Sequence, residues 1–121
     1  MSEIQKKRYD LEERTFIFTR GVALWCKSLP KDIINIEYIK QVVRSSGSIG
    51  ANYIEANESL SKKDFAMRIR IARKEAKETI YWLQLLLSLN LGAAHEAEGK
   101  RLLGEATELK KILSAILSKS V

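Results

Sequence analysis

The sequence has very little of the residue types that carry most catalytic and metal chemistry. Its 121 residues include one cysteine, Cys26, and one histidine, His95. A single cysteine rules out an internal disulfide, and a metal site built from cysteines and histidines is excluded. A histidine needs partners to act as a base, and His95 is expected to be solvated at a helix start. No Glu-x-x-His pair of the di-iron bundles occurs. We therefore expect no enzyme activity, metal or cofactor.

Long hydrophobic runs are also lacking. No stretch approaches the roughly 18 apolar residues that cross a membrane, and the charged N-terminus has no hydrophobic signal region. We expect a cytoplasmic protein without a membrane partner.

The chain has a moderate excess of positive charge. Lysine and arginine number 21 against 15 acidic residues, giving a net charge of +6. This excess is compatible with an anionic partner, although a basic balance can also serve solubility alone.

Apolar residues recur at helical spacing in four segments, and only one proline interrupts the chain. Helices are predicted over about 10–28, from between Asp32 and Ile36 to about 59, over 62–89 and over 95–118. Asp10 and Ser61 begin capping boxes, and Gly92 is the expected left-handed cap that ends the third helix. Short connections favour an all-α, antiparallel up-down-up-down four-helix bundle over residues 10–118, with a flexible N-terminus at 1–9 and a C-terminal tail at 119–121.

The stretch from Arg44 to Ser59 is unusual because small residues occupy the face expected to be buried. That face carries Ile39, Val43, Ser46, Gly50, Tyr53, Ile54 and Asn57. Helical glycine costs about 1 kcal/mol relative to alanine, so a neighbouring helix is expected to approach closely. The residues predicted to allow it are Ser46, Gly47, Gly50 and Ala51. A phosphate loop is the alternative, but GSIG lacks the Gly-Lys-Ser/Thr ending.

A polar group in the same stretch has two interpretations. Arg44, Asn52 and Glu55, with Asn57 and Glu58 nearby, can form a structural network or a site. The sequence leaves both open. An enzyme function would depend on this group alone, without a paired base and nucleophile.

The third helix carries more than one stripe. A second apolar stripe on this helix, together with two apolar residues of the first helix, holds more side chains than one core can bury. The six residues are Ile17, Leu24, Met67, Ile71, Trp82 and Leu85. If exposed together, these residues favour self-association; the alternative is that some of them widen the core.

A basic stripe lies between the apolar stripes of the third helix: Lys63, Arg70, Arg73, Lys74 and Lys77. We predict that it binds phosphates of RNA or DNA. Because no aromatic residues interleave with these charges, base stacking is not expected. The alternative is a solvated face paired with Asp64, Glu75 and Glu78.

Three segments carry a resemblance to a known family. RSSGSIGANYIEANESLSKKDF from Arg44, RIARKEAKETIYWL from Arg70 and YDLEERTF from Tyr9 resemble the 23S rRNA intervening-sequence proteins, also called the S23 family. The resemblance covers roughly residues 9–117. It implies an antiparallel four-helix bundle that assembles as a homopentameric ring. A relative, the accessory protein of diversity-generating retroelements, binds nucleic acid and a reverse transcriptase.

Two functions follow from the residues and the resemblance together. One is a non-enzymatic, oligomeric protein that binds structured RNA through the basic stripe. The other is an interaction scaffold with a protein client and no direct nucleic-acid contact, for which the surplus of apolar residues argues. Most members of the family have no established activity, so the resemblance implies the fold more strongly than the function.

Overall fold

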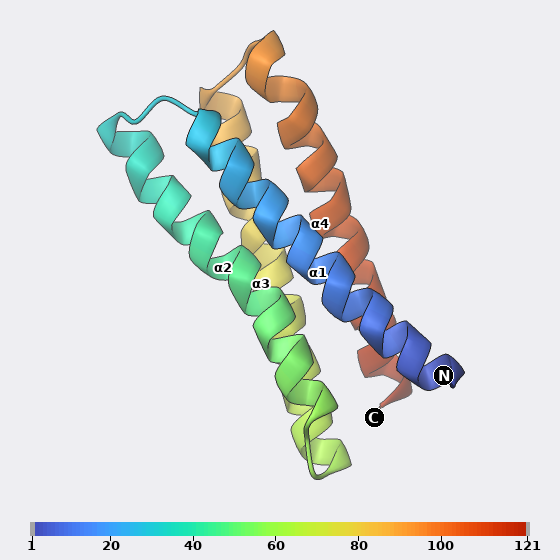
Figure 1. Ribbon diagram of the computed structural model, residues 1–121. Coiled ribbons are helices and arrows are strands. Elements are labelled where there is room, and N and C mark those ends of the chain that lie inside the picture. Colours follow the sequence, from blue (N-terminus) through green and yellow to red (C-terminus); the bar gives the residue numbers. More distant parts are fainter. Residues whose placement is uncertain (1, 121) are drawn as a thin grey trace.

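The computed structural model describes residues 2–120, apart from the side chains of residues 4–9. Its four helices are α1 (Glu3–Ser28), α2 (Ile33–Asn57), α3 (Lys62–Leu89) and α4 (Ala93–Lys119). Consecutive helices run antiparallel and lie side by side (Figure 1). Each helix packs against two others, in the cyclic order α1, α2, α3, α4; α2 and α3 share the most extensive contact and α1 and α4 the least. The predicted all-α antiparallel four-helix bundle is confirmed.

Side-chain caps fix the starts of the two central helices. The Asp32 carboxylate accepts a hydrogen bond from the Asn35 amide at 2.8 Å, and the Ser61 hydroxyl accepts one from the Asp64 amide at 3.1 Å. Each cap satisfies a backbone N–H that has no partner within its own helix. The Ser61 cap was predicted, and α2 begins within the range expected for it, between Asp32 and Ile36. The α3 bounds, Lys62–Leu89, agree with the prediction.

Two predicted boundaries were wrong. The first helix begins at Glu3 instead of Asp10, because the residues before Asp10 are mostly Glu, Gln, Lys and Arg, which are good helix formers. The expected flexibility of residues 1–9 stays a prediction, since most of their side chains lie outside the described part. Gly92 does not end α3. Asn90 occupies that C-cap, and Gly92, with φ of 141°, is the N-cap of α4.

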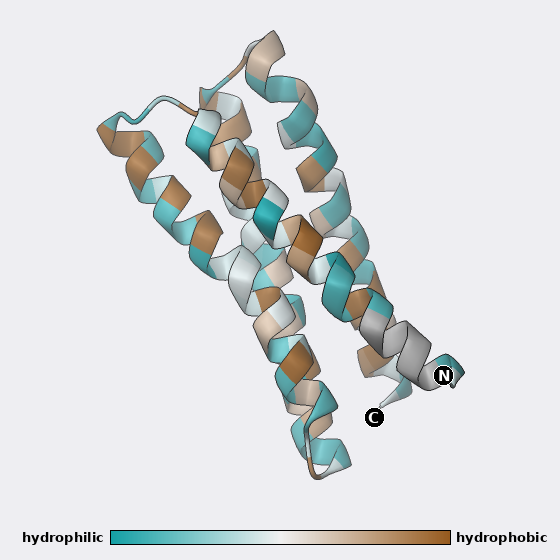
Figure 2. Cartoon of the chain, in the orientation of Figure 1, coloured by the Kyte–Doolittle hydropathy of each residue, from teal (hydrophilic) through white to brown (hydrophobic). Residues whose placement is uncertain are grey.

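The interior is filled by apolar side chains from all four helices. Hydrophobic residues recur along each helix, as the brown segments of the cartoon show (Figure 2). On α2 the buried apolar residues are Val42, Ile49, Tyr53 and Ala56. The face predicted for this helix was partly wrong, because Val43 and Ile54 are 43% and 46% exposed. A second apolar stripe, rotated by about one residue (100°) on the helix, carries Val43 and Ile54 outside the core.

The small residues of α2 differ in what they contact. A Cβ added to Gly50 would lie 2.8 Å from the Thr15 hydroxyl, and the Ser46 carbonyl accepts a hydrogen bond from Thr19 Oγ1 at 3.0 Å. These two positions therefore bring α1 close to α2. A Cβ on Gly47 would meet nothing closer than 3.9 Å, and Ala51 is exposed, so Ala51 takes no part in this packing.

The start of α4 is tightly packed at Gly99, although glycine lowers helix propensity. A Cβ on Gly99 would lie 2.5 Å from Leu87 and 2.7 Å from Trp25. The Trp25 indole also donates a hydrogen bond to the His95 carbonyl at 2.9 Å. Gly99 thus allows two large side chains to pack directly against the α4 backbone.

Candidate nucleic-acid interface

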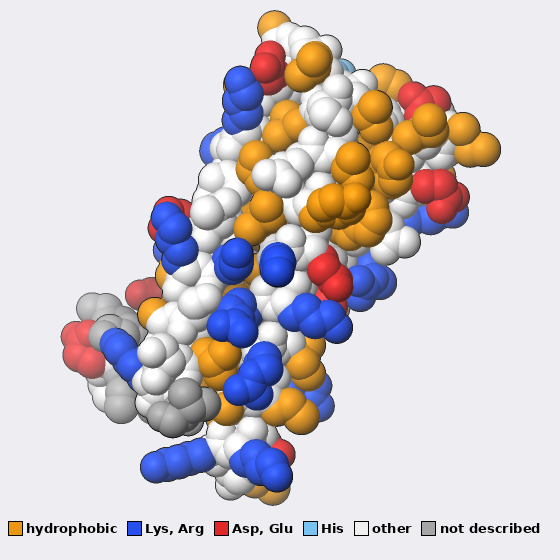
Figure 3. Space-filling model, turned by 180° about the vertical axis from the view of Figure 1, so that it is seen from behind, with side chains coloured by type: hydrophobic (Ala, Val, Ile, Leu, Met, Phe, Trp, Pro, Cys, Tyr) orange, Lys and Arg blue, Asp and Glu red, His pale blue; other side chains and the backbone are white. Residues whose placement is uncertain are grey.

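The predicted basic residues lie along the side of α3 that borders α4. Lys63, Arg70, Lys74 and Lys77 are exposed, and Arg73 is half-buried. Seen from behind, the molecule shows lysine and arginine side chains gathered across the middle of this face, below a cluster of hydrophobic side chains (Figure 3). Positive side chains are therefore concentrated on this face (Figure 3).

The acidic residues of α3 do not neutralise this surface. Glu75 and Glu78 lie on the side facing α2, where the Arg44 guanidinium contacts them at 3.5 and 3.3 Å. Among the side chains that the structure describes, no carboxylate forms an ion pair with any of the five basic residues. The face is exposed to solvent, but the ion pairs with Asp64, Glu75 and Glu78 that the alternative expects are not found among the described side chains.

A groove between α3 and α4 gathers most of these cations. It has a volume of about 500 Å³, and its lining includes Arg70, Arg73, Lys74 and Lys77 from α3 and Lys110 from α4. Sequence reasoning missed Lys110, because α4 was interpreted only for its core stripe. Its placement depends on how α4 lies against α3, which helical periodicity does not give. We call these five residues, with Lys63 farther along α3, the basic surface.

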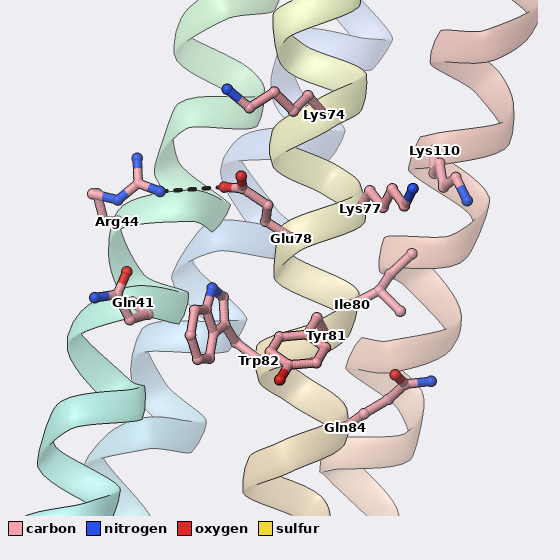
Figure 4. Close-up of a pocket in the computed structure, with 10 residues that line it drawn as sticks. All are labelled: Gln41, Arg44, Lys74, Lys77, Glu78, Ile80, Tyr81, Trp82, Gln84 and Lys110. Atoms are coloured by element: carbon pink, nitrogen blue, oxygen red, sulfur yellow. Dashed lines mark hydrogen bonds and ion pairs between the residues drawn. The ribbon is translucent and has the colours of Figure 1, made fainter.

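A second cavity, of about 760 Å³, continues from this groove toward α2. Lys74, Lys77 and Lys110 line it too, together with Tyr81 and Trp82 (Figure 4). The basic stripe itself contains no aromatic residue, as expected, but Tyr81 and Trp82 lie beside three of the lysines. Tyr81 comes one helical turn after Lys77, beyond the segment in which the basic residues were compared.

The residues predicted to mediate self-association occupy separate surfaces. Ile17 and Leu24 are 60% and 49% exposed on α1. On α3, Met67 is 43% exposed, while Ile71, Trp82 and Leu85 are half-buried. Because α1 and α3 lie diagonally and do not pack on each other, the six residues do not form one patch. The self-association predicted for these residues stays a prediction.

The polar group of α2 is dispersed. Arg44 contacts the two glutamates of α3, whereas Asn52 donates to the Ser48 carbonyl at 2.9 Å and accepts from Arg68 at 3.3 Å. Glu55 is exposed. Arg44 and Asn52 thus contact different residues of α3, and among the described side chains no hydrogen bond or ion pair joins Arg44, Asn52 and Glu55 to one another.

The cysteine is buried and the histidine is half-buried. Cys26 is buried in the core, and burial raises the pKa of its thiol to about 11. The His95 ring is half-buried with Nδ1 shielded from solvent, which corrects the expectation that it is solvated. Within the described residues, no group of three or more His, Cys, Asp or Glu side chains could hold a metal ion.

Within residues 2–120, no helix has the length and hydrophobicity needed to span a bilayer.

Comparison with known proteins gives a consistent result. The family model for the 23S rRNA-intervening sequence protein matches residues 7–115. A protein with unknown function from the S23 ribosomal protein family of Bacteroides thetaiotaomicron has a similar crystal structure, with a TM-score of 0.80 and 31% identity over 93% of this chain and 98% of that chain. No curated protein matches the sequence. Because the family model and the structural neighbour both cover nearly the whole bundle, we conclude that this chain belongs to the 23S rRNA-intervening sequence protein family.

Proposed function

We propose that this protein is a non-enzymatic, oligomeric nucleic-acid-binding protein whose basic surface contacts the phosphate backbone of structured RNA. One observation carries the proposal. Among the described side chains, the five predicted cations of α3 and Lys110 form no ion pair with a carboxylate, while Arg44 contacts Glu75 and Glu78 of the same helix at 3.5 and 3.3 Å. Two carboxylates of α3 are therefore engaged by Arg44, which leaves the neighbouring cations available to an anionic partner.

Contacts to phosphate account for affinity without base recognition. Each lysine or arginine that meets a phosphate releases about 0.9 counterion from duplex nucleic acid. The five α3 residues alone would give a slope of log K against log salt of about −4 to −5. Such binding follows the shape of the helix and its backbone, and it tells RNA from DNA through the groove and the 2′-hydroxyl.

Assembly is the second part of the proposal. The exposed apolar residues of α1 and those of α3 lie on separate surfaces, and a ring larger than a dimer requires two different contact surfaces on each subunit. The family resemblance supports a homopentamer. A ring would repeat the basic surface in every subunit and increase affinity through multivalency. We propose that this assembly functions in the cytoplasm.

Binding to a hairpin RNA in a salt titration tests this function. We expect binding at about 50 mM salt that weakens steeply toward 200 mM. Reversal of Arg70, Arg73 and Lys77 to glutamate should abolish binding while helicity by circular dichroism stays unchanged. A control variant with the same charge change at Arg20, Lys27 and Lys40, exposed residues of α1 and α2, should bind much more tightly than the groove variant. Absence of binding at low salt would refute the proposal.

The alternative is a scaffold for a protein client. The observation that favours it is the large exposure of apolar side chains such as Phe16 at 69% and Ile33 at 79%. A pull-down with and without nuclease separates the two functions, because a direct protein partner survives removal of nucleic acid.

A further inference from the structure

Three aromatic rings form a row along the outside of α2 and α3, at the edge of the basic surface. The Trp82 ring packs against Tyr38 with centroids 5.7 Å apart, and its other neighbour is Tyr81, at 5.1 Å and an interplanar angle of 72°. Trp82 and Tyr38 are half-buried, whereas Tyr81 is 56% exposed. Tyr81 therefore presents ring surface to solvent and is supported from behind by Trp82.

Unpaired positive charge lies next to this exposed ring. Lys77 precedes Tyr81 by one turn, which is about 6 Å along the helix axis. Lys77, Lys110 and Tyr81 line the same cavity of about 760 Å³. In the close-up, Lys77 and Lys110 extend into the space between α3 and α4, with Tyr81 a turn farther along α3 (Figure 4). Glu78 also lines this cavity, and its carboxylate is held by Arg44 at 3.3 Å.

We propose that this cavity binds an unpaired nucleotide within the nucleic acid: the base stacks on Tyr81, and the adjoining phosphates contact Lys77 and Lys110. The inference rests on the proposed function and adds the chemistry of the ligand. Phosphate contacts alone give no use to an exposed aromatic ring, and an apolar partner would not place its surface against three lysines. A nucleotide carries a flat π-surface and an anionic group within a few ångströms of each other.

The same geometry excludes a base inside a continuous duplex. A paired base is covered on both faces by its neighbours and cannot stack on a protein side chain. The ligand must therefore offer a bulged, looped or single-stranded nucleotide, which is where RNA-binding proteins usually read bases. The amides of Gln41 and Gln84, which line the same cavity, supply donors and acceptors for the edge of the base.

Two hairpin RNAs of equal stem length, each closed by the same polyethylene-glycol linker so that neither has a nucleotide loop, test the proposal with the full chain. One is fully paired, and the other carries a single bulged 2-aminopurine, whose fluorescence is quenched when it stacks. We expect tighter binding of the bulged hairpin and quenching on binding. Replacing Tyr81 by alanine should raise Kd for the bulged hairpin by roughly 5- to 150-fold, the range for one lost stacking contact, and change Kd for the paired hairpin by less than about twofold. Tyr81→Phe should behave like the original protein.

The outcomes separate this inference from the proposed function. If the paired hairpin binds and the bulge adds nothing, the stacking site is refuted and phosphate binding stands. If neither hairpin binds at low salt, both proposals fall. Equal losses on both hairpins in Tyr81→Ala, or a change in assembly mass by light scattering, would assign Tyr81 a structural role and overturn the inference. Free adenosine monophosphate that binds as tightly as the bulged hairpin would also overturn it, because the ligand would then be a small molecule.

Discussion

Asn35 and Asn90 join the start of α2 to the end of α3 by a pair of reciprocal amide hydrogen bonds. Asn35 Nδ2 donates to Asn90 Oδ1 at 2.8 Å, and Asn90 Nδ2 donates to Asn35 Oδ1 at 3.0 Å. The same two amides donate to the carbonyls of Pro30 and Leu86 at 2.9 and 2.8 Å. Both side chains are buried. One contact thus links two helices and the connection between α1 and α2.

Removing one member of this pair should destabilise the bundle. In Asn90→Ala, the Asn35 side-chain oxygen loses its donor while it remains buried, and an unsatisfied buried group costs about 1–3 kcal/mol. Urea denaturation measures the loss. Replacing both asparagines by leucine should cost less than the sum of the two single Asn→Ala changes, because no polar atom is then left unpaired. A loss below about 0.5 kcal/mol for Asn90→Ala would show that the pair contributes little.

The α1–α2 contact predicts opposite effects for two glycines of the same helix. Alanine at Gly50 places a Cβ 2.8 Å from the Thr15 hydroxyl, so overpacking should cost about 1–3 kcal/mol and exceed the gain in helix propensity. Alanine at Gly47 has ordinary clearance and should stabilise by up to about 1 kcal/mol. Thermal and urea unfolding of both variants provide the comparison. Equal stabilisation by both would mean that α1 moves away at no cost.

The contribution of α4 to nucleic-acid binding depends on Lys110. Lys110→Ala should make the slope of log K against log salt less negative by about 0.9, the effect of one lost phosphate contact. Lys111 is the control, because it is exposed and pairs with Glu108 at 3.5 Å. Its replacement by alanine should leave the slope unchanged. Equal changes in both variants would mean that overall charge, and not the groove, determines affinity.

The buried thiol makes stability depend on alkaline pH. Burial raises the pKa of Cys26 from 9.0 to about 11, against a smaller opposite effect of the nearby Lys31 charge. A raised pKa means that the folded protein retains its proton longer than the unfolded chain. The thiol's stabilising contribution is therefore complete below pH 9.0 and is lost as the pH approaches about 11. The unfolding free energy of the original protein should fall more steeply over this range than that of Cys26→Ala. Parallel curves would contradict the prediction.

Helix positions and the fold class could be predicted from the sequence because they follow from local signals. Asp32 and Ser61 are strong N-caps, and a short connection forces α2 and α3 to be antiparallel. The prediction of the buried face of α2 failed in part because two local signals competed there. Val42 and Val43 lie on adjacent apolar stripes of α2, and only the position of α1 and α3 decides which one is buried.

The candidate site was predictable only in part, because it is made by more than one helix. The basic stripe of α3 is visible in the sequence, but Lys110 joins it through the packing of α3 against α4. Tyr81 and Trp82 are visible as residues, yet their relation to Tyr38 and to the lysines depends on helix rotation. Periodicity describes one helix at a time and does not give these relations.

Arg44 has a consequence beyond the two carboxylates that it contacts at 3.5 and 3.3 Å. It stands on α2, outside the groove between α3 and α4, yet it offsets the negative potential that Glu75 and Glu78 would otherwise spread over the lysines of α3. A relative with a neutral residue at this position would keep all six cations and still present a weaker anion-attracting field. The guanidinium on one helix thus governs the electrostatic character of a face built by two others.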